Sequence, residues 1–363
     1  MEIGILTLPF NANYGGILQA WALQTALEQM GHHACHINSI PHWHLQPWLR
    51  PVAYAKRLAE QRLLGRSKRI RFEEFNNAIC RNTNAFISRH IHLAPESDTR
   101  RLRPGTFDAI IVGSDQVWRR DFWRDITVPF LAFTEGWNLR RVAYAASFGL
   151  DTWRYDDGAT ARCAELLARF DLVSVREHSA QVLAERHLHR AAQLMPDPTM
   201  LLRCDDYRSL IAPDTPTSPS TNSLFAYVLG PSTEAQATIR RMADERHLTV
   251  SAILADDDIS RPTEACIRPP LETWLTGIAG ASLVVTNSFH GCVLAAIFQK
   301  PFTVLPYAAG GQTRIDSLVK SLGLNLADTI HDTAQPHVQQ RLDAMRRQGL
   351  DFLRQATRPQ PQT

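Results

Sequence analysis

Short apolar runs alternate along the chain with segments in which apolar residues recur every three or four positions. In the first half, runs typical of buried strands lie at 3–7, 33–37, 109–112, 142–145 and 172–175. Segments with helical spacing follow at 17–30, 159–168 and 179–186. Because strands alternate with helices, the pattern predicts a parallel sheet covered by helices on both faces.

A stretch rich in Pro, Ser and Thr interrupts this alternation, and we place a linker at 205–222. The alternation then restarts. Strands are expected at 224–229, 249–254, 283–285 and 302–305, and helices at 234–246, 271–278, 291–298 and 315–322. The predicted domains are 1–204 and 223–330, followed by a C-terminal helix and tail at 331–363. We expect an α/β fold of two Rossmann-like domains facing a cleft, since ligands of open sheets bind beyond the carboxyl ends of strands.

The composition is that of an ordinary globular protein. Of 363 residues, 44% are hydrophobic and 21% are charged, which excludes a wholly disordered or fibrous chain. A formal net charge of +3 is too small to indicate nucleic acid as a partner. The sequence has no run of about 18 apolar residues, no secretory signal pattern and no CxxC pair among its six cysteines. We therefore expect a cytoplasmic protein with free thiols, no spanning helix and no metal site.

Residues 50–71 form a locally basic segment in which Lys and Arg far outnumber the one acid, Glu60. One interpretation is a peripheral contact with an anionic membrane surface, at the inner face of the membrane, or with a lipid-linked acceptor. The alternative is a helix whose charged face is simply solvated.

The most informative segment runs from Val284 to Gly291, where an apolar strand ends in small polar residues and His-Gly opens a helix. Free amides at a helix N-terminus favour a phosphate or carboxylate, and Gly291 allows close approach of a ligand. We therefore take Asn287, Ser288 and Gly291 as candidates for substrate binding. His290 is the catalytic candidate, because an imidazole near an anion can hold and deliver a proton. The alternative is a histidine that caps its own helix.

Two arginines are candidates for binding an anion. Arg176 directly follows an apolar strand, where a guanidinium can clamp a carboxylate or phosphate through two parallel hydrogen bonds. The alternative for Arg176 is an ion pair with Glu177 or Asp197. Arg314 opens a predicted helix and is either a second anion contact or a surface arginine.

Polar residues also follow two strands of the first domain. After 109–112, the candidates are Ser114, Asp115, Gln116 and Trp118. Asp115 is our choice for the base that activates a sugar hydroxyl, and Trp118 for an aromatic surface against a sugar ring. The alternative is a tight turn with a buried Trp118. The turn after the first strand adds Asn13, Tyr14 and Gly15 on the same rim.

Several of these segments, taken together, resemble one known family. They are Asn13–Leu23, Val112–Trp118, Tyr144–Gly149, Ser174–Glu177, Pro196–Pro198, Thr286–Gly291 and Lys300–Phe302. In this order they resemble the polysaccharide pyruvyl transferase family, from residue 3 to about 324. The family is similar in fold to two-domain glycosyltransferases of the B type.

The resemblance implies that His290 is the essential histidine and Arg176 the donor-binding arginine, and it adds Ser147 to the substrate-binding candidates. Some members have an arginine two residues before the histidine, where this chain has Ser288. Arg314 is the candidate for supplying that charge.

The implied reaction moves the pyruvyl group of phosphoenolpyruvate onto hydroxyls of a sugar, in a polysaccharide or its lipid-linked precursor. A pyruvate ketal forms and phosphate leaves. In our hypothesis His290 protonates the methylene carbon, while Arg176 and the helix start at Gly291 hold the anion. Phosphoenolpyruvate is then a co-substrate, and no cofactor is expected. Two alternatives are a nucleotide-sugar-dependent glycosyltransferase of the same fold and a non-catalytic carbohydrate-binding protein.

Overall fold

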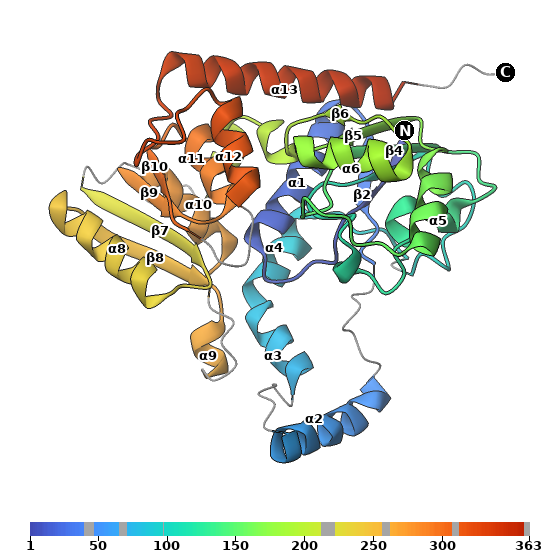
Figure 1. The fold of residues 1–363 in the computed structure, drawn as a ribbon, viewed down its shortest axis with the longest axis horizontal. Coiled ribbons are helices and arrows are strands. Elements are labelled where there is room, and N and C mark those ends of the chain that lie inside the picture. Colours follow the sequence, from blue (N-terminus) through green and yellow to red (C-terminus); the bar gives the residue numbers. More distant parts are fainter. Residues whose placement is uncertain are drawn as a thin grey trace.

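The computed structural model describes residues 1–39, 47–64, 71–96, 98–211, 222–255, 262–306 and 312–358. Within them, two parallel sheets form two lobes that lie side by side (Figure 1). Helices cover the faces of both sheets. This arrangement confirms the predicted α/β class with two Rossmann-like domains.

The sheet of the first lobe contains six strands, and every neighbouring pair is parallel. Across the sheet the order is β2 (His33–His36), β1 (Glu2–Leu6), β3 (Ala109–Val112), β4 (Arg140–Ala146), β5 (Leu172–Val175) and β6 (Gln193–Leu194). The central strands are buried on both faces, which explains their uninterrupted apolar sequence. The chain adds β2 on one side of β1 and β3 on the other, so the topological switch point lies between β1 and β3.

The second lobe repeats this arrangement with four parallel strands. Their order is β10 (Phe302–Val304), β9 (Leu283–Thr286), β7 (Ser223–Leu229) and β8 (Thr249–Ala255). The switch point of this sheet lies between β7 and β9. The loops that follow β3 and β9 therefore leave their sheets at the places where open α/β sheets bind ligands.

Helices connect the strands in both lobes. Those of the first lobe are α1 (Tyr14–Gln29), α2 (Arg50–Leu64), α3 (Phe72–Ile79), α4 (Arg81–His90), α5 (Asp157–Leu167), α6 (His178–Leu188) and α7 (Cys204–Arg208). Those of the second are α8 (Thr233–Glu245), α9 (Thr263–Cys266), α10 (Leu271–Gly280), α11 (Phe289–Ile297) and α12 (Gln312–Ser321). Short 3-10 turns are η1 (Pro47–Leu49), η2 (Arg120–Phe122), η3 (Val128–Phe130), η4 (Ala132–Thr134) and η5 (Pro198–Met200). Among the described residues, none of the helices combines the length and the hydrophobicity that crossing a bilayer requires.

The last helix, α13 (Pro336–Ala356), starts beside the second lobe and runs back across the first (Figure 1). It packs closely there, because a Cβ on Gly349 would lie 2.5 Å from both Leu201 Cδ2 and the Tyr144 hydroxyl. Just beyond the helix, Arg140 donates a hydrogen bond to the Arg358 carbonyl. The helix therefore fastens the two lobes together.

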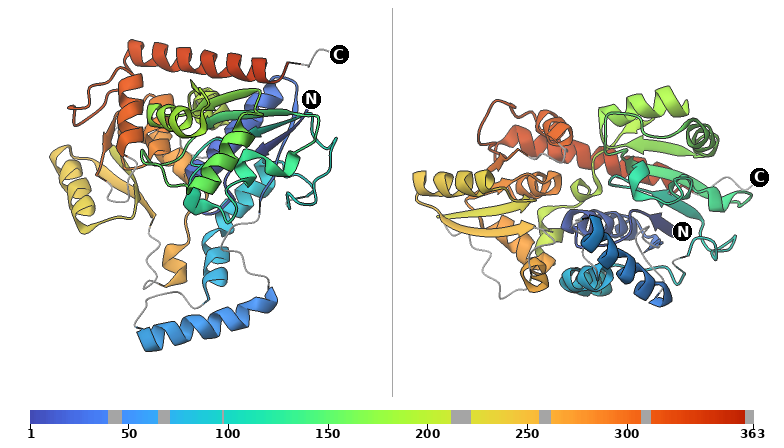
Figure 2. Two further views of the ribbon diagram at one scale, coloured as in Figure 1. Left: turned by 45° about the vertical axis from the view of Figure 1, so that its right-hand side comes forward. Right: turned by 60° about the horizontal axis from the view of Figure 1, so that its bottom comes forward.

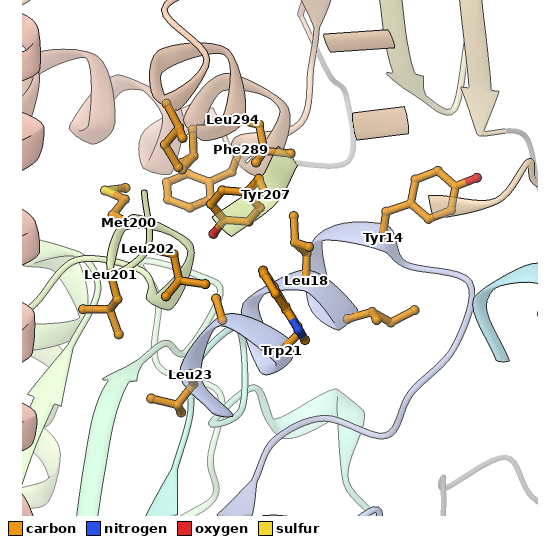
Figure 3. Packing of buried hydrophobic residues seen from close by; sticks show 14 of the residues in the cluster. Tyr14, Leu18, Trp21, Leu23, Met200, Leu201, Leu202, Tyr207, Phe289 and Leu294 are labelled. Atoms are coloured by element: carbon orange, nitrogen blue, oxygen red, sulfur yellow. The ribbon is translucent and has the colours of Figure 1, made fainter. Parts of the chain in front are cut away.

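One hydrophobic cluster is continuous between the lobes. Leu18 and Trp21 of α1, Tyr207 of α7, and Phe289 and Leu294 of α11 pack around one another (Figure 3). The two lobes therefore share one hydrophobic core. This shared core fixes the orientation of the lobes, and with it the way the loops after β3 and β9 face each other.

The predicted elements are found within a few residues of their expected bounds, but the first part of the predicted linker is folded. Residues 205–211 are folded: α7 starts at Cys204, and Tyr207 is fully buried. The Tyr207 ring packs on Trp21 at 5.6 Å, and its hydroxyl donates to the Thr199 carbonyl at 2.6 Å. The rest of the predicted linker, 212–221, and the tail at 359–363 lie outside the described residues.

Candidate active site

The two switch points bring together polar residues from both lobes. Asp115 lies in the loop after β3, and His290 lies in the first turn of α11, directly after β9. Gly15, in the first turn of α1, lies against the His290 ring: a Cβ added there would be 2.1 Å from Nδ1. The first lobe thus forms one wall of the space that holds His290.

A buried carboxylate, Asp197, connects these residues. Its Oδ2 accepts a hydrogen bond from Arg176 Nη1 at 2.7 Å and lies 3.6 Å from His290 Nε2. The Ser114 hydroxyl lies 3.4 Å from the same oxygen. The other oxygen, Oδ1, accepts hydrogen bonds from the Thr199 amide at 3.0 Å and hydroxyl at 2.7 Å. Asp197 therefore fixes an arginine from its own lobe and faces a histidine from the other.

Arg176 is surrounded by acidic groups. Besides Asp197, its Nη2 donates to Asp115 Oδ1 at 3.3 Å, and its Nε lies 3.7 Å from Glu177 Oε2. The guanidinium also lies over the Phe289 ring, 4.8 Å from its centroid. The ion pair that the sequence left as the alternative for Arg176 is therefore present, with Asp197 and with Glu177, and Asp115 forms a further one.

Burial and charge perturb the pKa values of this cluster in different directions. Burial alone would raise the pKa of the Asp197 carboxyl, but His290 and Arg176 beside it hold that pKa well below its usual range. Burial alone would lower the pKa of Arg176, but the neighbouring carboxylates raise it above its ordinary value. Burial raises the pKa of Glu177, and the charge of Arg176 offsets this only in part. Asp197 is thus held as an anion, whereas the pKa of Glu177 is raised in the same buried cluster.

A cavity of about 290 Å³ opens beside this cluster. Residues from both lobes and from α13 line it, among them Arg176, Glu177, Asp197, Phe289, Arg314 and Gln348. A second cavity of about 130 Å³ shares Glu177 and Arg314 with the first. The volume of the first suits a small organic anion.

Arg314 is a cation whose Nε is buried and makes no hydrogen bond to the described residues. Burial lowers its pKa, and the nearby charge of Arg176 lowers it further. Glu177 Oε2 is buried and lacks a hydrogen bond in the same way, while Oε1 accepts a hydrogen bond from the Ser147 hydroxyl at 2.5 Å. Unsatisfied buried polar groups are costly in a folded protein, so both are candidates for ligand contact.

The start of α11 differs from what the sequence suggested. The Ser288 hydroxyl caps the helix by accepting a hydrogen bond from the Gly291 amide at 3.4 Å, so this amide is already used. Gly291 is needed for packing, because a Cβ there would lie 2.6 Å from Thr286 Oγ1. Asn287 is also structural: its side chain forms two 2.8 Å hydrogen bonds with the backbone of Leu229. These contacts give the three residues structural roles, and their contact with a ligand stays a prediction.

The predictions for Trp118 and Tyr14 are corrected by packing. Trp118 is fully buried, stacks on Phe130 at 5.2 Å and donates to the Pro129 carbonyl at 3.3 Å, so no face is open to a sugar. Tyr14 is fully buried between the lobes, where it stacks on Trp274 at 5.4 Å. In both cases the aromatic ring is in the core.

The remaining predicted residues surround the cluster without entering the main cavity. Asn13 caps α1 by accepting from the Gly16 amide at 3.3 Å, and it lines a small pocket of about 30 Å³ together with Asp115. Ser114 is buried and donates to the Ala145 carbonyl at 2.9 Å. Gln116 accepts a hydrogen bond from Arg119 at 2.9 Å. Of the predicted residues, the structure therefore brings together His290, Asp115, Arg176 and Arg314, with Gly15 against the His290 ring, Ser114 beside Asp197 and Ser147 bonded to Glu177.

Two residues of the cluster were not among the predicted site residues. Asp197 stands between two prolines, three residues after the end of β6, a pattern that fits an ordinary turn equally well. Glu177 follows Arg176 and was considered only as its ion-pair partner. The available signal was that both acids follow strands whose carboxyl ends meet at one edge of the sheet.

Comparisons with known proteins cover nearly the whole chain. One similar structure is S. aureus MnaA with UDP, 12% identical, with a TM-score of 0.47, covering 97% of this chain and 91% of that one. Another is UDP-GlcNAc 2-epimerase from Neisseria meningitidis bound to UDP-GlcNAc, 10% identical, with a TM-score of 0.46 and coverages of 98% and 93%. No curated protein sequence matches significantly. The family model described as polysaccharide pyruvyl transferase matches residues 13–308, which include all of the cluster except Arg314.

Proposed function

Since the chain belongs to the polysaccharide pyruvyl transferase family and is thus a pyruvyltransferase enzyme, we propose that its donor is phosphoenolpyruvate. The acceptor is a pair of hydroxyls on a sugar of a polysaccharide or of its lipid-linked precursor, and the product is a pyruvate ketal. The observation that carries the proposal is the buried Nε of Arg314, which makes no hydrogen bond to the described residues and lies in a residue that lines a cavity next to the Asp197–His290 pair.

The donor carries a phosphate and a carboxylate and therefore needs more than one positive group. Arg314 supplies the first, because the described residues give its buried Nε no partner. A protonated His290 supplies the second, with Asp197 as its counter-charge 3.6 Å away. Glu177 lines the same cavity, its Oε2 makes no hydrogen bond to the described residues, and burial raises the pKa of its carboxyl.

The reaction begins with proton transfer from His290 to the methylene carbon of the donor. The π electrons of the C=C bond take up this proton, so the double bond becomes a single bond, a methyl group forms, and positive charge develops on the adjacent carbon. A sugar hydroxyl attacks this carbon, and phosphate leaves as the second hydroxyl closes the ring. One hydroxyl proton replaces the proton given by His290, and the other leaves with phosphate, so the enzyme returns to its starting state. Positive groups assist by holding the departing phosphate.

Asp115 is our proposed contact to the acceptor. Its Oδ1 is held by Arg176 at 3.3 Å, which fixes the orientation of the carboxylate. The residue also lines the small pocket between the first strand end and α1. A hydroxyl placed there meets a carboxylate that can accept its proton.

The test is a comparison of donors with the wild-type enzyme and the variant His290→Ala. We expect phosphate release from phosphoenolpyruvate in the presence of an acceptor sugar, and a loss of kcat of about 10²–10⁴ in the variant, as for other positioned proton donors. The exposed His337→Ala is the matched control and should behave as wild type.

Three results contradict the proposal. Release of nucleotide from a sugar nucleotide indicates a glycosyltransferase of the same fold. Absence of turnover with either donor, combined with saturable sugar binding, indicates a carbohydrate-binding protein. Unchanged turnover in His290→Ala removes His290 from the reaction.

A further inference from the structure

The helix α2 lies apart from the rest of the molecule. In Figures 1 and 2 it lies beyond the end of α3, away from both sheets. Contacts with α3 attach it: Arg57 donates two hydrogen bonds, at 2.9 and 3.0 Å, to the Glu73 carboxylate, and its guanidinium lies 5.9 Å from the centroid of the Phe72 ring. The face of α2 that carries Arg57 is therefore turned toward the protein.

The opposite face is apolar and open to solvent. Val52, Ala59 and Leu63 lie seven and eleven residues apart along the helix, so they form one stripe. Val52 is 69% exposed and Leu63 is 81% exposed, and Trp48 in the preceding turn η1 is 73% exposed. These are the three most exposed large hydrophobic side chains of the described residues. The next is Leu93, at 45%.

Positive charges border this stripe. Lys56 and Arg62 are exposed and lie on either side of the line through Val52 and Leu63. The single acid of α2, Glu60, is displaced from that line toward the side of Arg57. An apolar centre bordered by cations is the pattern of a helix that lies in the surface of an anionic bilayer.

We propose that α2 and η1 form a membrane-docking surface that inserts Trp48, Val52 and Leu63 among the lipids. Lys56 and Arg62 then contact anionic headgroups, with their aliphatic stems along the apolar stripe. The helix lies in the plane of the membrane and does not cross it. The arrangement explains why an apolar stripe faces away from the protein, a position in which it otherwise gains nothing from burial.

The proposal commits to lipid because of charge. An apolar stripe that pairs two copies of the chain would bring Lys56 and Arg62 close to the same residues of the partner copy, and like charges repel. An anionic bilayer attracts both residues at once. The inference is independent of the donor and applies equally if another group is transferred.

The experiment is flotation of the full-length protein with vesicles, without donor or acceptor. One set of vesicles contains phosphatidylcholine alone, and the other contains phosphatidylcholine mixed with phosphatidylglycerol. We expect wild type to float with the mixed vesicles and much less with phosphatidylcholine alone. The double variant Lys56→Gln, Arg62→Gln should lower the partition coefficient about 30-fold on mixed vesicles.

The apolar part is tested with a second double variant, Val52→Asn with Leu63→Gln, which should lower binding at least about tenfold. The matched control is Leu326→Gln, which replaces another exposed leucine, 44% exposed, on the other lobe. It should bind as wild type does. All changed side chains are exposed, so the circular dichroism spectra and melting temperatures should stay unchanged.

Three results overturn the proposal. Wild type fails to float with the mixed vesicles at low salt, the Val52 and Leu63 variant floats like wild type, or sedimentation shows a lipid-free dimer that Leu63→Gln dissociates. The last result would assign the stripe to a contact between copies. Because no substrate is present, none of these results bears on the transferase proposal.

Discussion

The contact between Gly15 and His290 offers a sharp test of the site, because it changes the position of the histidine without removing it. Gly15 is the second residue of α1, and its backbone lies against the imidazole of the other lobe. In Gly15→Ala the new methyl group would lie 2.1 Å from Nδ1 and 2.5 Å from Cγ of His290, whereas ordinary contact begins at 3.4 Å. The ring must therefore move by about 1 Å or more, or the lobes must separate by a similar distance.

The expected effect on catalysis is large and the effect on stability is small. A displacement of about 1 Å at a reacting group costs on the order of 10²-fold in rate, so kcat should fall about 100-fold. Alanine favours a helix over glycine by about 1 kcal/mol, while overpacking costs about 1–3 kcal/mol, so the free energy of unfolding should fall by no more than about 2 kcal/mol. The donor KM should change much less than kcat, because Arg314 is untouched and His290, although displaced, is still present.

The assay is steady-state phosphate release at varied phosphoenolpyruvate, with chemical denaturation of the same samples. Gly158→Ala is the matched control, because Gly158 is also the second residue of a helix, α5, and its added Cβ would meet only Asp156 Oδ1 at 3.4 Å. The control should keep the wild-type kcat. If Gly15→Ala turns over as fast as wild type, the position of His290 does not limit the reaction, and its role as proton donor is wrong.

Three further predictions concern the surrounding residues. Arg314→Gln should raise the KM for phosphoenolpyruvate about 10- to 100-fold, which corresponds to the loss of one charged hydrogen bond, and Arg314→Lys should restore part of the loss. An unchanged KM in steady-state kinetics would exclude Arg314 from the donor site. The lowered pKa of Asp197 contributes stability that is present above its unfolded pKa of about 3.9 and is lost as the pH falls toward the folded value. Asp197→Asn should therefore lower the free energy of unfolding at pH 7 by about 3 kcal/mol, since Arg176 stays buried with fewer partners. Below about pH 4, the free energy of unfolding of the variant should decline less steeply with falling pH than that of wild type. If the two proteins lose stability in parallel across this range, the linkage is refuted. Trp118→Phe should lower the melting temperature and leave the KM for the acceptor within about twofold of wild type, because the indole is in the core; a large change in that KM would restore a ligand contact.

The fold was largely predictable because its signals are local. Strands that are buried on both faces have continuous apolar runs, as in β3 and β9, and their neighbours show helical spacing. The exceptions depend on distant contacts. Strand β6 has only two residues, too few for any periodicity, and α7 is fixed by the contact of Tyr207 with Trp21, which is remote in the sequence. Local composition cannot contain such information.

The candidate site was predictable where a residue's place along a strand determines its position. His290 and Asp115 follow strands at the switch points of the two sheets, so the place of each residue at a ligand-binding strand end follows from topology. Exposure was not predictable. Trp118 and Tyr14 also lie in segments that follow strands of the first sheet. The sequence does not show that Phe130 covers the Trp118 ring or that the second lobe covers the Tyr14 ring.

The charges around Arg176 change which arginine binds the donor in our proposal. From the sequence, Arg176 is the anion clamp and Arg314 its substitute. In the structure, Asp197, Asp115 and Glu177 all lie within 4.0 Å of the Arg176 guanidinium, so an incoming phosphate would have to approach a cation that carboxylates already surround. Arg314 has no such partner among the described residues and faces the cavity. Arg176 instead holds Asp197 as an anion. That carboxylate lies 3.6 Å from His290 Nε2, so in our proposal Arg176 acts on the proton donor through Asp197. A change at Arg176 should therefore alter the pH dependence of kcat, whereas a change at Arg314 should alter the donor KM.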